Sequence, residues 1–399
     1  RDRAFDRQGI QGLDDLTDAR DGVADRVPRV RTRQRLELEA HMRRSIPALT
    51  SMLAACILAG GLTAQDAPLD PLSDTGLMYA VGADLSFLKS AEDSGIQFKD
   101  GGVVKPGLDI FRDHGYDWIR LRVFHTPTEL PNDLDYTIAL AQDAKQRGYR
   151  FMLDYHYADG WADPQKLPIP AAWDTTDIAA LTDSVREWTA HTIRAFREAG
   201  VMPEMVQIGN EVRNGMMWPL GRLPDNWDNF ARLFQAGVEG IEAGRGAAPM
   251  PSIMLHYDNG ADTEGAKAFY DRFNEYGIPY DIIGYSYYPW WHGTLLELRD
   301  NFISTLEHFP DKDVILVEAG YRPYVYESEG RLPPYPVDAP GGPRKAFLEA
   351  VNQTLLGISD PRIKGIFWWE PASACDRDYF DADCNARPVI TVFDRYKRN

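Results

Sequence analysis

Residues 135–155 read DYTIALAQDAKQRGYRFMLDY, and this stretch contains the unit on which the fold is built. Its first part has the mixed apolar and polar spacing of an amphipathic helix, carried by Ile138, Ala141, Gln142 and Lys145. The helix is predicted over Asp135–Arg147 and ends at Gly148, a usual C-terminal stop. The apolar run Arg150–Tyr155 that follows has the length and composition of a buried strand.

The same alternation of short strands and longer helices continues to the C-terminus, for example in the predicted helix Thr182–Ala199. Eight segments have strand character: Tyr79–Asp84, Trp118–Val123, Arg150–Tyr155, Met205–Gly209, Ser252–His256, Ile282–Ser286, Val314–Val317 and Gly365–Trp369. Eight parallel strands are what a closed barrel needs. We therefore expect an α/β fold, a (β/α)8 TIM barrel over residues 79–399. A doubly wound open sheet is the alternative, but no glycine-rich phosphate loop follows the first strand.

The region before the barrel divides into three parts. Residues 1–41 are rich in Arg and Asp and lack an apolar period, so we interpret them as translated upstream of a true start at Met42, with a disordered tail as the alternative. Residues 42–64 join two arginines to an apolar stretch and then to small residues, as in a signal peptide, and are too short to span a bilayer. Residues 65–78 form a Pro- and Asp-rich linker.

This anatomy predicts a protein that is secreted, either extracellular or periplasmic. Leu53-Ala54-Ala55-Cys56 also resembles a lipobox, so lipid anchoring through Cys56 is the alternative. Either cleavage leaves Cys375 and Cys384, nine positions apart, as the cysteines of the folded part. Export favours a disulfide between them, with two free thiols as the alternative. Two cysteines with no histidine between them do not suggest a zinc site.

Charge and aromatic content restrict the partners. The formal net charge is -17, which disfavours nucleic acid and anionic membranes, because both attract clustered Lys and Arg. The 10 Trp and 19 Tyr often lie near Gly, Pro and acidic residues, where flat rings suit sugar binding. We expect an acidic monomer with no membrane span that acts on a neutral substrate.

Polar residues follow the predicted strands at their C-terminal ends, where barrel enzymes build their active sites. They are Asp84, Arg120, Arg122, Asp154, His156, Asn210, Glu211, His256, Tyr257, Asp258, Tyr285, Tyr287, Glu318, Trp368, Trp369 and Glu370. Carboxylates beside apolar strand ends are costly unless they are paired or used. The barrel is therefore predicted to be a single catalytic domain.

Two carboxylates directly follow hydrophobic runs: Glu211 after the fourth strand and Glu318 after the seventh. Acetal hydrolysis needs a proton donor and a group that captures the oxocarbenium-like carbon, and two carboxyls supply both. At about 5–5.5 Å separation the second carboxyl attacks directly and configuration is retained. We assign Glu211 as general acid/base and Glu318 as nucleophile, against the alternative of a salt bridge at the barrel rim for each.

Seven further residues are predicted to bind substrate: Asp84, Arg122, His156, Asn210, His256, Tyr287 and Trp369. Asn210 would hydrogen-bond the hydroxyl next to the reacting carbon, Tyr287 would donate to Glu318, and Arg122 would keep Glu318 ionised. His156 would contact the sugar, with a structural histidine as the alternative. In the Trp368-Trp369 pair we expect Trp369 in the cleft, stacked on a sugar ring.

Several motifs together resemble glycoside hydrolase family 53, the arabinogalactan endo-β-1,4-galactanases. They are Gly82-Ala83-Asp84-Leu85-Ser86, Ile119-Arg120-Leu121-Arg122-Val123, the run from Asp154 to Pro164, Gln207-Ile208-Gly209-Asn210-Glu211 and Gly284-Tyr285-Ser286-Tyr287-Tyr288-Pro289. The resemblance covers the chain from about Tyr79 onward. It implies cleavage of β-1,4-galactan, as in type I arabinogalactan of pectin, by double displacement, with Glu211 as acid/base and Glu318 as nucleophile.

This chain departs from the family pattern in two places. Ala319-Gly320-Tyr321 stands where Thr-Ala-Tyr or Thr-Gly-Tyr is expected, and the Pro-rich loop 322–344 is individual, which leaves subsite number and product length open. Some members of the family resemble calcium binders in loops after the last strands. Here Asp376, Asp378, Asp381 and Asp383 offer oxygen ligands, but we expect a solvated acidic loop, no metal and no cofactor.

Three other functions fit parts of the pattern. The nearest is a retaining endo-β-glucanase or mannanase of the same clan, since barrel, carboxylates and aromatic residues would look alike. A non-catalytic carbohydrate-binding barrel is a second, although the presence of both glutamates with Asn210 speaks against it. A metal-dependent barrel hydrolase is a third, and sensitivity to chelators separates it.

Overall fold

The computed structural model describes residues 79–174, 176–336 and 338–396. The segments 1–41 and 42–64, with the lipobox cysteine Cys56, and the linker 65–78 lie outside the described residues. The expected signal peptide, lipid anchor and secretion therefore stay predictions.

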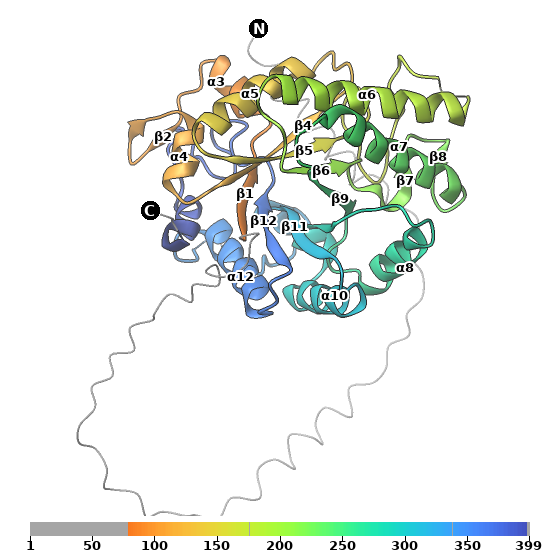
Figure 1. Ribbon diagram of the computed structural model, residues 1–399. Helices are drawn as coiled ribbons and strands as arrows, with labels where there is room; N and C mark the ends of the chain where they lie inside the picture. The colour runs from red at the N-terminus through yellow and green to blue at the C-terminus, as the bar shows by residue number, and fades with distance from the viewer. Residues whose placement is uncertain (1–78, 175, 337, 397–399) are drawn as a thin grey trace, which may run out of the picture. The chain divides into compact units, whose positions relative to one another are not determined.

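Eight parallel strands close into a barrel, with helices around it (Figure 1). The strands are β1 (Ala80–Asp84), β4 (Trp118–Val123), β5 (Arg150–Tyr155), β6 (Met205–Ile208), β9 (Ser252–Tyr257), β10 (Ile282–Tyr287), β11 (Asp313–Ala319) and β12 (Ile363–Trp368). Around the barrel they follow the order β1, β12, β11, β10, β9, β6, β5, β4. The expected TIM barrel is confirmed, and the open-sheet alternative is excluded because β1 pairs with both β4 and β12.

Several of the long helices begin at side chains that cap their free N–H groups. Asp133 caps α5, Asp177 caps α6, and Thr294 with Glu297 forms a capping box on α10. The main helices are α5 (Leu134–Gln146), α6 (Ile178–Glu198), α7 (Trp227–Arg245), α8 (Thr263–Asn274), α10 (Leu295–His308) and α12 (Pro343–Gly357). The two helices predicted from the sequence, α5 and α6, thus agree with the structure within a few residues at each end.

Shorter elements fill the connections between barrel units. They are α3 (Leu88–Asp93), α4 (Gly107–Asp113), α9 (Pro289–His292), α11 (Pro323–Ser328), β2 (Lys99–Asp100), β3 (Val103–Val104), β7 (Gly215–Met216), β8 (Gly221–Arg222) and the 3-10 helices η2 (Val212–Asn214) and η3 (Pro388–Tyr396). Of these, η2 and α9 directly follow strands of the barrel and carry residues around the candidate site.

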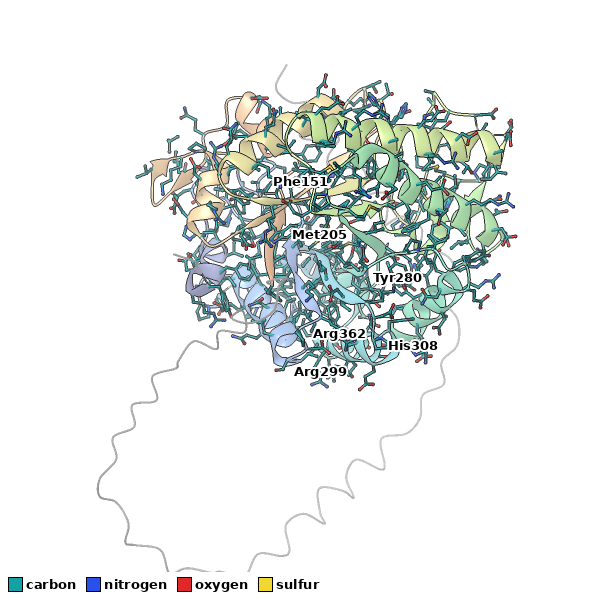
Figure 2. All side chains as sticks on the ribbon, viewed as in Figure 1. Phe151, Met205, Tyr280, Arg299, His308 and Arg362 are labelled. Carbon is teal, nitrogen blue, oxygen red and sulfur yellow. A yellow bond between two sulfur atoms is a disulfide. The ribbon has the colours of Figure 1, made fainter. Side chains whose placement is uncertain are left out.

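The inside of the barrel is packed with apolar side chains, most of which lie in the first half of their strands. They are Ala80, Trp118, Met152, Met205, Met254, Ile282, Ile315, Val317 and Phe367. Alternate strand residues point inward, and glycine makes room where two large side chains meet. A Cβ on Gly82 would lie 2.2 Å from the Phe367 ring, so only glycine fits there. In the side-chain view Met205 lies near the centre of the barrel and Arg299 at the periphery (Figure 2).

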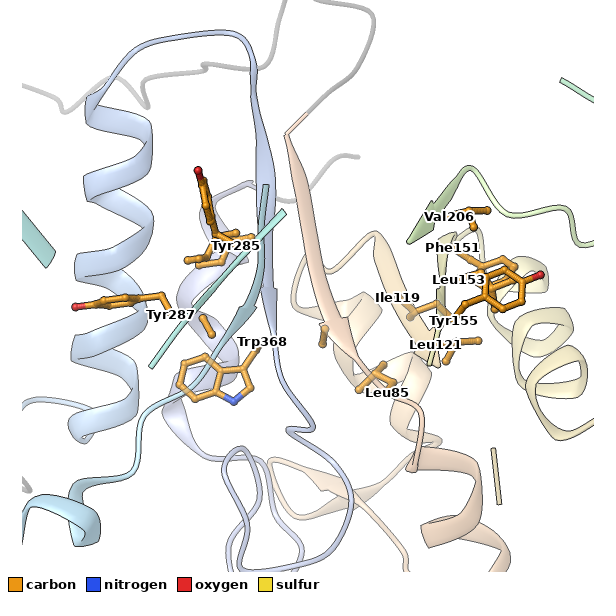
Figure 3. Close-up of a cluster of buried hydrophobic side chains, with 14 of the residues drawn as sticks. Leu85, Ile119, Leu121, Phe151, Leu153, Tyr155, Val206, Tyr285, Tyr287 and Trp368 are labelled. Atoms are coloured by element: carbon orange, nitrogen blue, oxygen red, sulfur yellow. The ribbon is translucent and has the colours of Figure 1, made fainter. Parts of the chain in front are cut away.

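The intervening strand residues point outward and form the larger core under the helices. Leu121, Leu153, Tyr155, Tyr285 and Tyr287 belong to this core (Figure 3). This alternation decides which residues at the strand ends can reach the mouth of the barrel. No helix among the described residues is long and apolar enough to cross a membrane.

A disulfide links Cys375 and Cys384, whose Cα atoms are 4.7 Å apart. The four aspartates of this loop do not converge on one point. Asp376 pairs with Arg387, Asp378 pairs with Arg344, and Asp381 accepts the backbone N–H groups of residues 383 and 385. At least one carboxylate oxygen of Asp376, Asp378 and Asp381 therefore already has a protein partner.

Candidate active site

Arg120 is the central charge of a polar layer above the apolar interior. It is buried on β4, and its guanidinium lies 2.8 Å from Glu318 Oε1, 2.9 Å from Asp154 Oδ2 and 3.0 Å from Asp84 Oδ2. It also donates to the side-chain oxygens of Gln207 and Asn210. A buried charge is tolerated when its donors are paired in this way. Arg120 thus ties together residues from β1, β4, β5, β6 and β11.

Arg122 does not hold Glu318, so that expectation is wrong. Its Nη2 lies 3.0 Å from Asp84 Oδ1 and also pairs with Glu370. Its guanidinium lies over the rings of Phe87 and Trp161, 5.0 and 4.6 Å from their centroids. Arg122 therefore supports the Trp161 ring at the mouth of the barrel. Arg120, not Arg122, is the arginine that pairs with Glu318.

Asp84 lies beneath the site, fully buried between the two arginines. Burial by itself would raise the pKa of Asp84, but Arg122, Arg120 and hydrogen bonds from Ser86 outweigh it and lower the pKa. A direct contact of Asp84 with substrate is therefore not available. The aspartate instead fixes the positions of Arg120 and Arg122.

Asp154 and His156 continue the network along β5. Burial would raise the pKa of Asp154, but Arg120 and His156 lower it to about 2. His156 Nδ1 accepts from Ala162 N at 3.2 Å, so its Nε2 carries the hydrogen that faces Asp154 at 3.1 Å. Both nitrogens are engaged, and the contact of His156 with the sugar stays a prediction that rests on its ring face.

Glu318 reaches the inside of the barrel through a bulge in β11. Ile315 and Val317 belong to the apolar interior, and strict alternation would turn Glu318 outward. The pairing with β10 shifts here, because Tyr285 pairs with Leu316 but Ser286 pairs with Glu318. Such a bulge re-aims the following side chain, and bulges are frequent beside active sites.

Tyr288, not Tyr287, donates to Glu318, so the expected contact of Tyr287 is wrong. Tyr288 Oη lies 2.8 Å from Glu318 Oε2. Tyr287 points outward, donates to the Gly293 carbonyl and stacks on Phe347 of α12 (Figure 3). It cannot contact substrate in this position.

Glu211 follows β6 and has a left-handed backbone, with φ 48° and ψ 54°. This conformation is costly for a non-glycine residue and tends to occur at functional sites. Ser286 Oγ donates to Glu211 Oε1 at 2.8 Å, and Glu211 N donates to His256 Nδ1 at 3.3 Å. Both contacts fix the glutamate relative to β9 and β10.

The carboxylates of Glu211 and Glu318 face each other. One oxygen from each, with one nitrogen of His256, lie within 4.8 Å of one another. Burial raises the pKa of both glutamates, but the opposing groups differ. Arg120 and Tyr288 oppose the rise at Glu318, whereas Glu318 and Asp258 increase it at Glu211 and only Ser286 opposes it. A single proton shared by the pair therefore resides on Glu211.

His256 is fully buried, so the predicted contact with substrate is wrong. Its Nδ1 accepts from Glu211 N, with Gln207 Nε2 also 3.1 Å away, and its Nε2 lies 2.9 Å from Ser286 Oγ. Glu211, His256 and Glu318 have the composition of a metal site. Both ring nitrogens of His256 are already engaged, however, so this donor set does not fit a metal.

Asn210 is placed as a substrate-binding group needs to be. Its Oδ1 accepts from Arg120 and Gln207, and its Nδ2 donates to the Ala162 carbonyl at 2.9 Å. These contacts fix the amide orientation and leave the second Nδ2 hydrogen for a ligand. Its contact with sugar remains a prediction.

Trp368 ends β12 and Trp369 follows it directly, and the two rings have different surroundings, while the stacking of Trp369 on a sugar stays a prediction. Trp368 is buried, and its Nε1 donates to Asp378. Trp369 is partly exposed, 6.2 Å from Trp161 between ring centroids, and Arg322 lies over its ring at 5.7 Å. Trp161 and Trp369 together offer two partly exposed aromatic surfaces.

Asp258 is a third buried carboxyl near the pair. It pairs with Arg213 of η2 at 2.9 Å, and burial raises its pKa to about 6 although Arg213 opposes the shift. Its charge adds to the rise in the pKa of Glu211. Sequence reasoning placed Asp258 at a strand end but gave it no role.

Sequence reasoning also gave no role to Gln207, Ser286, Tyr288 and Trp161. The alternation along β10 could have identified Ser286, because Ile282, Gly284 and Ser286 share the inward face of the strand. Tyr285 and Tyr287 share the other face. Nothing in the sequence announced the bulge that turns Glu318 inward.

A parallel (β/α)8 barrel with two facing carboxyls, an amide beside one of them and tryptophans at the mouth is the arrangement of a glycoside hydrolase. A model of glycosyl hydrolase family 53 matches residues 80–396. The chain belongs to glycosyl hydrolase family 53.

Relatives extend this result over most of the chain. Arabinogalactan endo-β-1,4-galactanase A of Aspergillus niger is 35% identical over 312 residues, which cover 75% of this chain and 87% of its own. A probable arabinogalactan endo-β-1,4-galactanase A of Aspergillus terreus is 36% identical, covering 76% and 88%. The family 53 catalytic domain of Ignisphaera aggregans has a TM-score of 0.73 at 27% identity, covering 82% and 99%. A fungal β-1,4-galactanase has a TM-score of 0.71 at 29% identity, covering 79% and 99%.

Proposed function

We propose that the protein is a secreted, endo-acting, retaining hydrolase of β-1,4-galactan, the backbone of type I arabinogalactan. The observation that carries the mechanism is the carboxyl pair, in which oxygens of Glu211 and Glu318 lie within 4.8 Å of each other. Carboxyls with oxygens this close support the separation of about 5–5.5 Å of retaining enzymes, in which the second carboxyl attacks directly, over the about 6.5–9.5 Å of inverting enzymes, which place a water between their carboxyls.

In the first step Glu211 gives its proton to the glycosidic oxygen as the bond to the anomeric carbon breaks. Glu318 attacks that carbon from the opposite face and forms a glycosyl ester. Arg120 and Tyr288 favour the ionised form of Glu318, which is the form that attacks. The buried, anionic surroundings of Glu211 keep the proton on it until the leaving oxygen accepts it.

In the second step Glu211, now ionised, takes a proton from water. The water oxygen attacks the anomeric carbon, the ester bond to Glu318 breaks, and the two inversions leave the configuration unchanged. Asn210 donates to the hydroxyl next to the reacting carbon, and Trp369 with Trp161 stacks on sugar rings. These contacts strengthen as the ring flattens toward the transition state.

The substrate is inferred from the relatives, two of which carry names stating action on the β-1,4 bonds of arabinogalactan. The competing β-glucans and β-mannans differ in the orientation of individual hydroxyls, which loops at the mouth select. Secretion is proposed from residues 42–64, and N-terminal sequencing of protein recovered outside the cytoplasm tests it.

The deciding experiment measures reducing-sugar release from linear β-1,4-galactan, β-glucan and β-mannan by wild type and by Glu318→Ala. We expect activity on galactan alone and its loss in the variant. Hydrolysis of another polymer would refute the substrate while retaining the mechanism. Binding without hydrolysis, unchanged in Glu211→Gln, would identify a carbohydrate-binding barrel, and loss of activity with a chelator would indicate a metal-dependent enzyme.

A further inference from the structure

Two buried polar residues contact Glu211 but lie too deep to touch substrate. His256 and Ser286 are fully buried on adjacent strands, β9 and β10. Together with Glu211 they form a closed circuit. Glu211 N–H meets His256 Nδ1 at 3.3 Å, His256 Nε2 meets Ser286 Oγ at 2.9 Å, and Ser286 Oγ meets Glu211 Oε1 at 2.8 Å.

The direction of each hydrogen bond in this circuit follows from elementary chemistry. A backbone N–H only donates, so Nδ1 of His256 accepts, and in a neutral imidazole Nε2 then carries the hydrogen. That hydrogen occupies a lone pair of the Ser286 hydroxyl. The hydroxyl hydrogen is therefore directed to Glu211 Oε1.

We propose that His256 and Ser286 are positioning residues that leave the transferable proton of Glu211 on Oε2. An oxygen that accepts a strong hydrogen bond is the less basic of the two, so the proton favours the other one. The same hydrogen bond strengthens when Glu211 becomes ionised, which eases proton transfer to the leaving oxygen. This inference rests on the proposed role of Glu211 as acid/base.

The charged groups around His256 and Glu211 favour this arrangement of hydrogen bonds, in which His256 is neutral. Burial and then the charge of Arg120 lower the pKa of His256 well below its usual value, although Asp154 opposes the shift. His256 therefore stays neutral at working pH. Burial raises the pKa of Glu211, the charges of Glu318, Asp258 and Asp163 raise it further, and the Ser286 hydroxyl lowers it.

The test compares two substrates with leaving groups of very different basicity, both built on the sugar that the wild-type enzyme is found to cleave, and each variant is compared with wild type on the same substrate. One is the unactivated polysaccharide, and the other is a 2,4-dinitrophenyl glycoside, whose leaving group departs without protonation. We expect Ser286→Ala to lower kcat/KM on the polysaccharide by about 10- to 100-fold, a share of the general-acid contribution. On the aryl glycoside the loss should be less than about threefold, since that bond breaks without the acid.

Two controls separate the possible failures. Glu211→Gln should show the same leaving-group dependence with a larger effect, and its absence would refute the acid assignment itself. Thr305→Val removes another buried hydroxyl, one bonded to Tyr285 Oη at 2.8 Å, and should leave both rates unchanged. Equal losses on both substrates in Ser286→Ala, with leaving-group dependence intact in Glu211→Gln, would overturn the positioning role alone.

A second measurement does not depend on turnover. Imidazole ¹⁵N NMR of the whole protein should show His256, identified by its absence in His256→Gln, as the neutral Nε2–H form from about pH 5 to pH 8. The Nδ1–H form or a titration within that range would contradict the directed circuit.

Discussion

The lower and upper parts of the barrel interior use the same strand alternation for opposite purposes. Near the strand starts the inward positions carry Trp118, Met152 and Met254, which belong to one cluster of buried apolar side chains. Two residues further along the same strands stand Arg120, Asp154 and His256, all buried and joined in one network with Glu318. The difference teaches that one layer supplies packing free energy whereas the next places charge where a reaction needs it.

The largest expected effect is at Glu318. Glu318→Ala should reduce polysaccharide hydrolysis by at least roughly four orders of magnitude, because no other group replaces the nucleophile. With an activated aryl glycoside, azide should enter from the vacated side and give the α-glycosyl azide. Glu211→Ala, which keeps the nucleophile, should give the β-glycosyl azide. Product NMR checks both, and the opposite pairing of products would exchange the two roles.

The lower layer should respond in stability instead. Met254→Ala should lower the free energy of unfolding by about 2–5 kcal/mol through the cavity it leaves, measured by chemical denaturation. The exposed Met250→Ala is the matched control and should stay within about 0.5 kcal/mol. The pH profile of the folded Met254→Ala enzyme should match wild type, and a displaced profile would show that the two layers are not separate.

Two adjacent tyrosines test how sharply alternation divides the roles. Tyr288→Phe removes a hydrogen bond to a carboxylate, of about 1.5–3 kcal/mol, and should lower kcat/KM by roughly 10- to 100-fold. Tyr287→Phe removes a bond to a backbone carbonyl and should change kcat/KM by less than about twofold, with roughly 1 kcal/mol lost in stability. Steady-state kinetics measure kcat/KM of both variants, and equal losses would contradict the assignment of Tyr288 as the hydrogen-bond donor to Glu318.

The smallest expected effect is a displacement of the pH profile by Asp258→Asn. The Asp258 carboxylate raises the pKa of Glu211, so its removal should lower that pKa. The alkaline limb of kcat/KM should then move to lower pH. Because Asp258 itself has a pKa of about 6, rates well below pH 6 should be nearly unchanged. Asp271→Asn, on the exposed side of α8, removes the same charge and should leave the limb in place.

Much of the fold was readable from local patterns. The eight strand segments were found because each is a short apolar run between helical stretches, and their bounds agree with the structure within about two residues. The polar residues after these runs were found for the same reason. The hydrogen-bond and ion-pair partners of these polar residues were not found, because period-two alternation tells which residues share a face but not which strand lies opposite.

The sequence by itself indicated the barrel and the two glutamates at the strand ends through spacing along the chain, and the family through the resemblance of its motifs. Only the tertiary structure decided that Arg120 rather than Arg122 faces Glu318, that Tyr288 replaces Tyr287, and that His256 lies beneath Glu211 instead of beside a sugar. The physical reason is the same in each case. Register between strands and a bulge at Val317 set the direction of these side chains, and both arise from pairing between segments distant in the sequence.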